Sequence, residues 1–181
     1  MLHLKNITAG NPKTAEQYQL TKQYDVTWLF SEDGKNWYEE QKNFASDTIK
    51  MVYTGDGRVV WVGKDVTGIE PRNASVIEVP DITANRRITV PGYWFYRDGN
   101  FIFDYKLKAE DERDALLKQV SMMTSEWEKD LLLGLISDED REKLKAYRIY
   151  AKSLQAMDFS TITDKTSYNA IEWPVSPEAS S

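Results

Sequence analysis

The sequence predicts an α+β fold, with antiparallel β-hairpins in the N-terminal part and an antiparallel helical hairpin followed by an extended tail at the C-terminus. Between residues 26 and 105, short β-branched and aromatic runs flank turns rich in Asp and Gly, which is typical of hairpins. Between residues 109 and 157, apolar residues recur at spacings of three and four, which indicates helices with one buried face. These patterns divide the chain into an N-terminal arm at 1–24, a β-rich domain at 25–105, and a helical hairpin with its tail at 106–181.

Three hairpins are predicted in the β-rich domain. Their strand pairs are residues 26–30 with 36–38, 49–53 with 58–62, and 92–96 with 100–105. The intervening turns contain Asp33-Gly34, Gly55-Asp56-Gly57 and Asp98-Gly99, and glycine supplies the positive φ that such turns require. One more short strand is expected at 75–79, in a connector punctuated by prolines. Residues 1–24 are polar and lack clear periodicity, so they are expected to form a loosely held arm.

Helical character is expected to begin near Ala109 and to end near Gly134. The predicted buried face of this helix consists of Leu116, Leu117, Val120, Met123, Trp127 and Leu131. Ser137 and Asp140 have the spacing of a capping box, which predicts the start of a second helix. The apolar face of that helix consists of Leu144, Tyr147, Ala151 and Leu154. Because the connection is short, the two helices should pack antiparallel.

The composition excludes several classes of protein. There are no cysteines, so disulfides, thiolate metal sites and cysteine nucleophiles are all excluded. The only histidine, His3, is expected to be solvated near the chain end, which argues against zinc and serine-triad chemistry. The net charge of −6 argues against nucleic-acid binding. No apolar run approaches the ~20 residues of a membrane helix, and no secretory signal is recognised, so a soluble protein without membrane insertion is expected.

The acidity is concentrated in the helical third. Between residues 109 and 145 there are 11 acidic and 6 basic residues. An acidic helix face is usually solvated, but it can also meet a basic partner. Pairs such as Glu126 with Asp130, or Asp98 with Asp104, could formally serve a glycosidase, but turn chemistry and solvated helix positions explain them better. The protein is therefore predicted not to be an enzyme, and no cofactor or metal is expected.

Aromatic residues carry a heavier signal. The third hairpin has rings on both faces, and its candidate partner-binding residues are Trp94, Tyr96, Phe101, Phe103 and Tyr105. One face can be core, whereas exposed rings on the other would mark an interface. Three interpretations stay open: core packing alone, a protein interface, and contact with a glycan.

The helical part and the tail add three candidates. Trp127 and Tyr147 are interpreted as packing between the helices, and Tyr150 is kept as a candidate partner-binding residue. Pro174 and Pro177 favour extended backbone before them, so the tail containing Trp173 and Pro174 is expected to lie on another surface. This segment could cap the protein's own sheet or pair with a partner's strand edge.

These elements, in this order, resemble the tail fibre assembly proteins of tailed phages. The resemblance covers roughly residues 50–177. It is carried by residues 56–63 and 65–71, by the acidic helix through Trp127 and residues 131–133, by residues 147–150 with Leu154 and Asp158, and by residues 171–174 with Pro177.

The resemblance implies a function and a partner. Members of this family bind the C-terminal end of a trimeric tail fibre and help its chains to trimerise in the host bacterial cytoplasm. Some remain on the fibre tip and influence contact with the host surface. The implied protein is a chaperone without an ATP site, with the aromatic hairpin and the terminal segment as its fibre-facing surface. The alternative is a carbohydrate-binding receptor module at the fibre tip, whose partner would be a host surface glycan.

Overall fold

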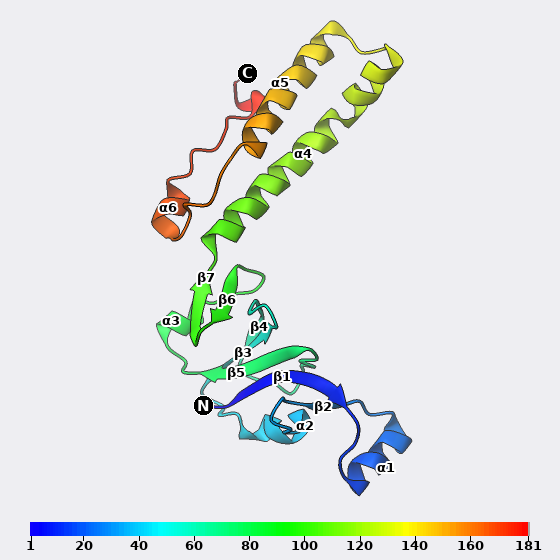
Figure 1. The fold of residues 1–181 in the computed structure, drawn as a ribbon, viewed down its shortest axis with the longest axis vertical. Helices are drawn as coiled ribbons and strands as arrows, with labels where there is room; N and C mark the ends of the chain where they lie inside the picture. The colour runs from blue at the N-terminus through cyan, green and yellow to red at the C-terminus, as the bar shows by residue number, and fades with distance from the viewer. Residues whose placement is uncertain (181) are drawn as a thin grey trace. The chain divides into compact units, whose positions relative to one another are not determined.

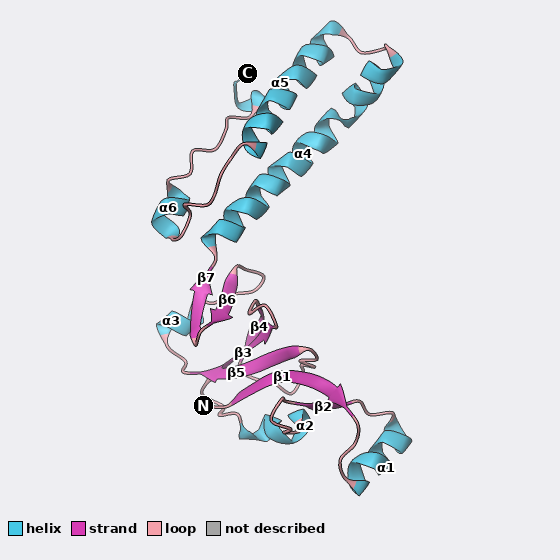
Figure 2. Ribbon diagram, in the orientation of Figure 1, coloured by secondary structure: helices cyan, strands magenta, loops and turns pink. Residues whose placement is uncertain are grey.

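A computed structural model describes residues 1–180 (Figure 1). The chain forms two compact units, Met1–Phe103 and Asp104–Ser181. The first is built on antiparallel strands and the second on helices, as the colours of Figure 2 show. The predicted α+β class is confirmed.

The first unit contains a five-stranded antiparallel sheet with the strand order β2-β1-β5-β3-β4. Its strands are β1 (His3–Gly10), β2 (Trp28–Phe30), β3 (Ile49–Thr54), β4 (Val59–Gly63) and β5 (Ala74–Val79). The β3–β4 hairpin and the β5 strand confirm the second predicted hairpin and the strand expected at 75–79.

Strand β1 lies inside the sheet, between β2 and β5, so the expectation of a loosely held arm is wrong for this segment. Leu4 and Ile7 are both fully buried. They are three residues apart because the register shifts between them, where Asn6 adopts a φ of 48°. The amide of Asn6 donates to Ser75 Oγ at 2.9 Å. This bulge breaks the two-residue alternation from which a strand is recognised.

The first predicted hairpin is wrong in its second half. Asn36 bridges to Phe30, but its side chain then accepts a hydrogen bond from the amide of Tyr38 at 2.9 Å. This cap starts the short helix α2 (Trp37–Glu40), followed by the 3-10 turn η1 (Gln41–Asn43). Trp37 is fully buried, so tertiary packing outweighs the strand preference of this aromatic segment. Two further short helices are α1 (Ala15–Tyr24) and α3 (Thr83–Arg86).

The third predicted hairpin is confirmed as β6 (Trp94–Arg97) and β7 (Asn100–Phe103). Asp98 and Gly99 form its turn with φ values of 51° and 82°. The hairpin joins the large sheet through the amide of Tyr96, which donates to the Gly57 carbonyl at 2.7 Å. The predicted strand end at residue 105 is wrong, because a helix begins there.

Two hydrophobic clusters lie on opposite faces of the large sheet. On β3, Val52 belongs to one cluster and its neighbour Met51 to the other, as the alternation of side chains along a strand requires. The first cluster also contains Leu4 and Ile7, and the second contains Trp94. The aromatic hairpin is therefore held by the second face of the sheet.

The second unit is a hairpin of helices α4 (Tyr105–Leu133) and α5 (Asp138–Gln155), and Figure 1 shows their antiparallel course. Helix α4 begins four residues before the expected start, because the Asp104 carboxylate accepts from the Leu107 amide at 2.9 Å and caps it. Ser137 caps α5 as predicted, by accepting from the amide of Asp140 at 3.1 Å. The short helix α6 (Lys165–Asn169) and the turn η2 (Pro177–Ser180) interrupt the tail, so it is not extended throughout.

The core of the second unit lies between the two long helices. All four residues predicted on the buried face of α5 are buried, and Trp127 stacks near Tyr147 with ring centroids 6.0 Å apart. The predicted face of α4 is confirmed from Leu116 to Trp127 but not at Leu131, which is 46% exposed. The core thus stops before the connection between the helices.

Candidate functional site

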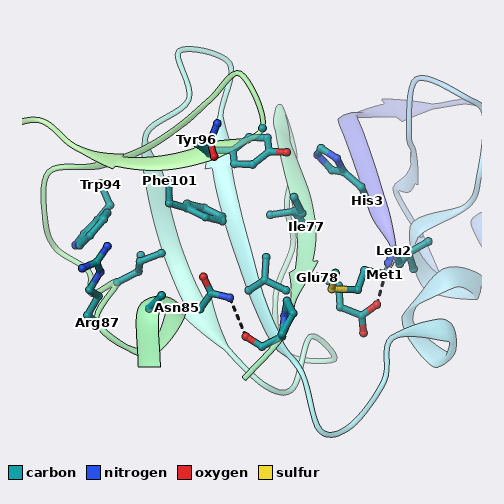
Figure 3. A pocket seen from close by; sticks show the side chains of 16 residues that line it. Met1, Leu2, His3, Ile77, Glu78, Asn85, Arg87, Trp94, Tyr96 and Phe101 are labelled. Carbon is teal, nitrogen blue, oxygen red and sulfur yellow. Dashed lines mark hydrogen bonds between the residues drawn. The ribbon is translucent and has the colours of Figure 1, made fainter. Parts of the chain in front are cut away.

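A cavity of about 470 Å³ opens in the first unit between the aromatic hairpin, β5, the segment around α3 and the first residues of the chain (Figure 3). Trp94, Tyr96 and Phe101 line it from the hairpin, and His3 and Arg87 line it from other elements. Segments more than 70 residues apart in sequence therefore meet here. Three of the eight predicted partner-binding residues share this cavity.

The aromatic wall is largely core, with one side turned to the cavity. Trp94 is only 9% exposed and packs with the cluster on the second face of the sheet. Its ring meets that of Phe103 edge-on, with centroids 5.2 Å apart and an interplanar angle of 83°. Tyr96 and Phe101 are half-buried cross-strand neighbours with centroids 5.0 Å apart. The rings are fixed against one another, so the wall is formed in advance of any ligand.

His3 is not solvated as expected, since it lies half-buried against two tyrosines. Its Nε2 is 2.8 Å from the Tyr53 hydroxyl, and its ring meets that of Tyr96 edge-on at 5.6 Å. Burial, followed by the positive charge of Lys5, lowers the pKa of His3 below its usual value, against a smaller opposing effect of Glu32. The imidazole is thereby favoured in its neutral form at neutral pH.

Glu78 ties the start of the chain to β5 beside the cavity. Its buried carboxylate accepts from the amide of Leu2 at 2.8 Å, and from the amide of Ala45 and the Thr48 hydroxyl at 2.7 Å each. Burial alone would raise the pKa of Glu78, but these hydrogen bonds and the charge of Lys50 outweigh it and lower the pKa. Glu78 is thus an ionised structural anchor whose acceptors are occupied.

The polar groups of the cavity that can contact a ligand are the guanidinium of Arg87 and the side-chain amides of two asparagines. The Arg87 guanidinium lies 5.5 Å from the Trp94 ring centroid, and within residues 1–180 it forms no ion pair. Asn85 and Asn100 also line the cavity, and each donates from Nδ2 to a backbone carbonyl, of Pro80 at 2.8 Å and of Asp98 at 3.1 Å. Aromatic faces beside a cation and amides can bind a ligand that is partly apolar and partly polar. The residues that line this cavity do not pair a nucleophile with a base.

Of the other five candidates, Phe103 packs against the second hydrophobic cluster of the first unit. The remaining four lie in the second unit, where they pack internally. Tyr105 lies 5.6 Å from Tyr168, between centroids, at the start of α4. Tyr150 is only 8% exposed, in the core between the helices. The eight candidates therefore do not form one continuous surface.

The tail containing Trp173 and Pro174 packs on its own unit. Trp173 contacts the core between α4 and α5, and its ring lies 5.8 Å from that of Phe159. Pro174 is half-buried. The segment therefore packs on the helices of its own unit, which neither of the two alternatives described. Pairing with a partner remains a prediction.

Sequence reasoning missed two groups of residues. His3, Glu78 and Arg87 reach the cavity only through the tertiary fold, and no local pattern marks them. The leucines around Gly134 are also conspicuous, since Leu132, Leu133 and Leu135 are 87%, 71% and 72% exposed. Their exposure could have been predicted from the sequence, because four leucines next to a helix end cannot all lie on one helical face.

Residues 1–180 contain neither a metal cluster nor a membrane helix. No three His, Asp or Glu side chains come together there as a possible metal site. In the same range, no helix combines the length and apolarity required to cross a membrane.

Comparison with known proteins identifies the family to which this two-unit α+β protein is similar. Residues 39–178 match the family model described as Caudovirales tail fibre assembly protein, lambda gpK. Tail fiber assembly protein U' of Escherichia phage Mu is 51% identical over 90% of this chain and 95% of its own length. The U' protein of Escherichia phage P1 is 48% identical over the same shares. Tail fiber assembly protein U of phage Mu is 41% identical over 98% of this chain and its full length.

The chain belongs to the tail fibre assembly protein family of tailed phages. The resemblance predicted from its sequence is confirmed. Because protein U of phage Mu is matched over 98% of this chain, the similarity extends into the N-terminal part that the resemblance did not cover.

Proposed function

We propose that this protein is a non-enzymatic chaperone that binds the C-terminal tip of a phage tail fibre and promotes its folding and trimerisation. Family membership supports a role in tail fibre assembly. The observation that carries the binding step is the preformed aromatic wall of Trp94, Tyr96 and Phe101, open on a cavity of about 470 Å³. In this proposal, the tip of the fibre docks at this cavity.

The physical need for such a partner arises before the fibre closes. Chains that intertwine expose strand edges and apolar surface until the trimer is complete, and such surfaces aggregate. An apolar side chain of the fibre can enter the cavity. Arg87 and the amides of Asn85 and Asn100 can then form hydrogen bonds with backbone or polar groups of the fibre. Strand β4 stands at the end of the five-stranded sheet, and the aromatic hairpin bridges to Arg58 just before this strand, so the edge of β4 beyond that bridge can pair with a fibre strand.

Binding energy alone drives the proposed activity. The sequence contains no Gly-rich loop followed by Lys-Ser or Lys-Thr, so no nucleotide cycle is invoked. A chaperone that binds the assembling tip and not the aggregated chain shifts the population toward the trimer by mass action. In this proposal, assembly takes place in the host bacterial cytoplasm, and the protein stays on the virion if dissociation is slow.

Co-expression with the fibre encoded beside this chain tests the proposal. The amount of soluble, SDS-resistant fibre trimer is compared with wild type, with the double variant Arg87→Glu/Phe101→Ala, and with no assembly protein. Lys42→Glu, on the exposed surface of the same unit, is the control for the charge change. We expect soluble trimer only when wild type or the control variant is co-expressed. The amount of trimer should be at least fivefold lower with the cavity variant than with wild type. Equal trimer without any assembly protein would reject the chaperone role.

A carbohydrate-binding module at the fibre tip is the second candidate. It is favoured by the residue types at the cavity, since aromatic faces with amide and guanidinium groups at the rim suit a sugar ring. Titration of the isolated protein with host surface polysaccharide, followed by tryptophan fluorescence, distinguishes the two. Saturable quenching that Arg87→Glu abolishes would favour the glycan function, whereas an unchanged signal would leave the fibre as the partner.

A further inference from the structure

The connection between α4 and α5 exposes an unusual amount of aliphatic surface. Leu131 is 46% exposed, Leu132 87%, Leu133 71% and Leu135 72%. Only Ile136, the next residue, is buried. We name Leu131, Leu132, Leu133 and Leu135 the leucine turn. Contiguous exposed apolar surface on this scale usually marks an interface.

The local backbone explains why these side chains point outward. Gly134 ends α4 with a φ of 70°, and its amide donates to the Leu131 carbonyl at 3.2 Å. The Leu135 amide donates to the Asp130 carbonyl at 2.8 Å, which completes a Schellman motif. In this motif the residue at the position of Leu135 commonly packs on the one at the position of Asp130. Here that partner is a carboxylate, so Leu135 has no apolar neighbour within the motif and stays exposed.

A groove lies one helical turn before the leucine turn along α4. Its cavity of about 750 Å³ is lined by Met123 and Trp127 of α4, by Ala146 and Tyr147 of α5, and by residues 177–178 of the tail. Leu131 lies four residues beyond Trp127, on the same face of α4. A ligand that extends at least one helical turn, about 5 Å, beyond the groove can therefore contact Leu131 as well.

Charge around this surface indicates which ligand fits. Between residues 126 and 143 there are seven acidic and three basic residues, so the local formal charge is −4. Glu139 and Glu142 line the groove itself. Each of the three bases is paired with a nearby carboxylate, and Lys129 and Lys143 form their pairs at 2.6 Å. The rim of the apolar surface is therefore acidic.

We propose that the leucine turn and its groove dock a polypeptide segment whose apolar side chains are flanked by lysine or arginine. Complementary charge favours this occupant over a second copy of the chain, which would bring a like charge of −4 against the first. An anionic lipid surface is disfavoured for the same reason. This surface belongs to the helical unit alone, and the proposal does not depend on the fibre-tip function of the aromatic cavity.

Peptide binding to the full chain tests this assignment. The probe is a fluorescein-labelled peptide with leucines at helical spacing and lysines elsewhere, about 14 residues long so that it can form a few helical turns. The matched peptide carries glutamates in place of the lysines. Fluorescence anisotropy should show saturable binding of the lysine peptide and at least tenfold weaker binding of the glutamate peptide. Raising the salt concentration should weaken the complex without abolishing it.

The decisive variant is Leu132→Asp/Leu133→Asp. It adds negative charge, so any loss of affinity for the lysine peptide must come from lost apolar contact. We expect at least a tenfold loss. The matched control is Met122→Asp/Ile149→Asp, which makes the same charge change at two exposed apolar residues outside the leucine turn, 64% and 59% exposed. The affinity of the control variant for the lysine peptide should be within twofold of that of wild type.

Three results would overturn the proposal. One is equal affinity of the turn variant and the control, and another is equal affinity of the two peptides. The third is concentration-dependent dimerisation of wild type that the turn variant loses in sedimentation analysis, which would assign the surface to a second copy of the chain. Circular dichroism confirms that each variant retains its helices.

Discussion

Tyr96 and Gly57 share a backbone contact that leaves no space for a side chain. The Tyr96 amide donates to the Gly57 carbonyl at 2.7 Å, and a Cβ on Gly57 would lie 2.6 Å from the Tyr96 carbonyl oxygen. Gly57 also has a φ of 91°. This contact holds the aromatic hairpin on the sheet, so the cavity wall depends on a glycine in a different hairpin.

Gly57→Ala should therefore destabilise the first unit by about 3 kcal/mol, because left-handed strain and a backbone clash add together. Chemical denaturation followed by tryptophan fluorescence measures the change. Gly99→Ala is the matched control, since Gly99 has a φ of 82° but a Cβ added to it would meet no atom within 4 Å. It should lose only about 1 kcal/mol. Equal losses in the two variants would show that the contact with Tyr96 contributes nothing.

Protonation of His3 should make the first unit less stable in mild acid. The pKa of His3 is lower in the folded than in the unfolded chain, so the unfolded chain binds more protons between the two values. Stability therefore rises with pH across that window, and it is lost as the pH falls below about 6.5. The free energy of unfolding is measured by denaturation at two pH values, one above this window and one about a unit below 6.5. Between them, His3→Gln should lose less free energy of unfolding than wild type. An identical loss would exclude His3 as the source.

Glu78 should contribute in a separate and more acidic window. Its folded pKa is lowered, so its contribution is present above its unfolded pKa and is lost as the pH falls through the folded value. Glu78→Gln should cost about 2 kcal/mol at neutral pH, because charge-assisted hydrogen bonds from Leu2, Ala45 and Thr48 are weakened. Thermal unfolding measures this loss. Glu70→Gln, at an exposed residue, should change stability by less than about 0.5 kcal/mol.

Removing the cap of α5 should destabilise the helical unit modestly. The Ser137 hydroxyl accepts from the Asp140 amide, and Ser137→Ala should cost about 1 kcal/mol. Ser153→Ala is the control, because that hydroxyl lies within the helix and only donates back to the Ile149 carbonyl. The control should be neutral or slightly stabilising in thermal unfolding followed by circular dichroism. A loss in both variants would point to a general effect of serine removal.

Local elements could be predicted because their causes lie within a few residues. Asp98 and Gly99 supply the positive φ values of the β6–β7 turn, and the spacing of Leu144, Tyr147 and Leu154 defines one face of α5. The family could likewise be recognised from the order of its segments. Elements set by distant contacts were not predicted, such as the interior strand β1 with its bulge and the helix α2 with buried Trp37.

The sequence by itself determined the α+β class, two of the three hairpins, the paired long helices and the family. Turn chemistry and side-chain periodicity act locally, so they can be read along the chain. The tertiary structure alone decided which aromatic rings are core and which line a cavity. It brought His3 and Arg87 to the wall of Trp94 and Tyr96, and it left the leucine turn uncovered. These features depend on burial between residues far apart in sequence, which no local pattern encodes.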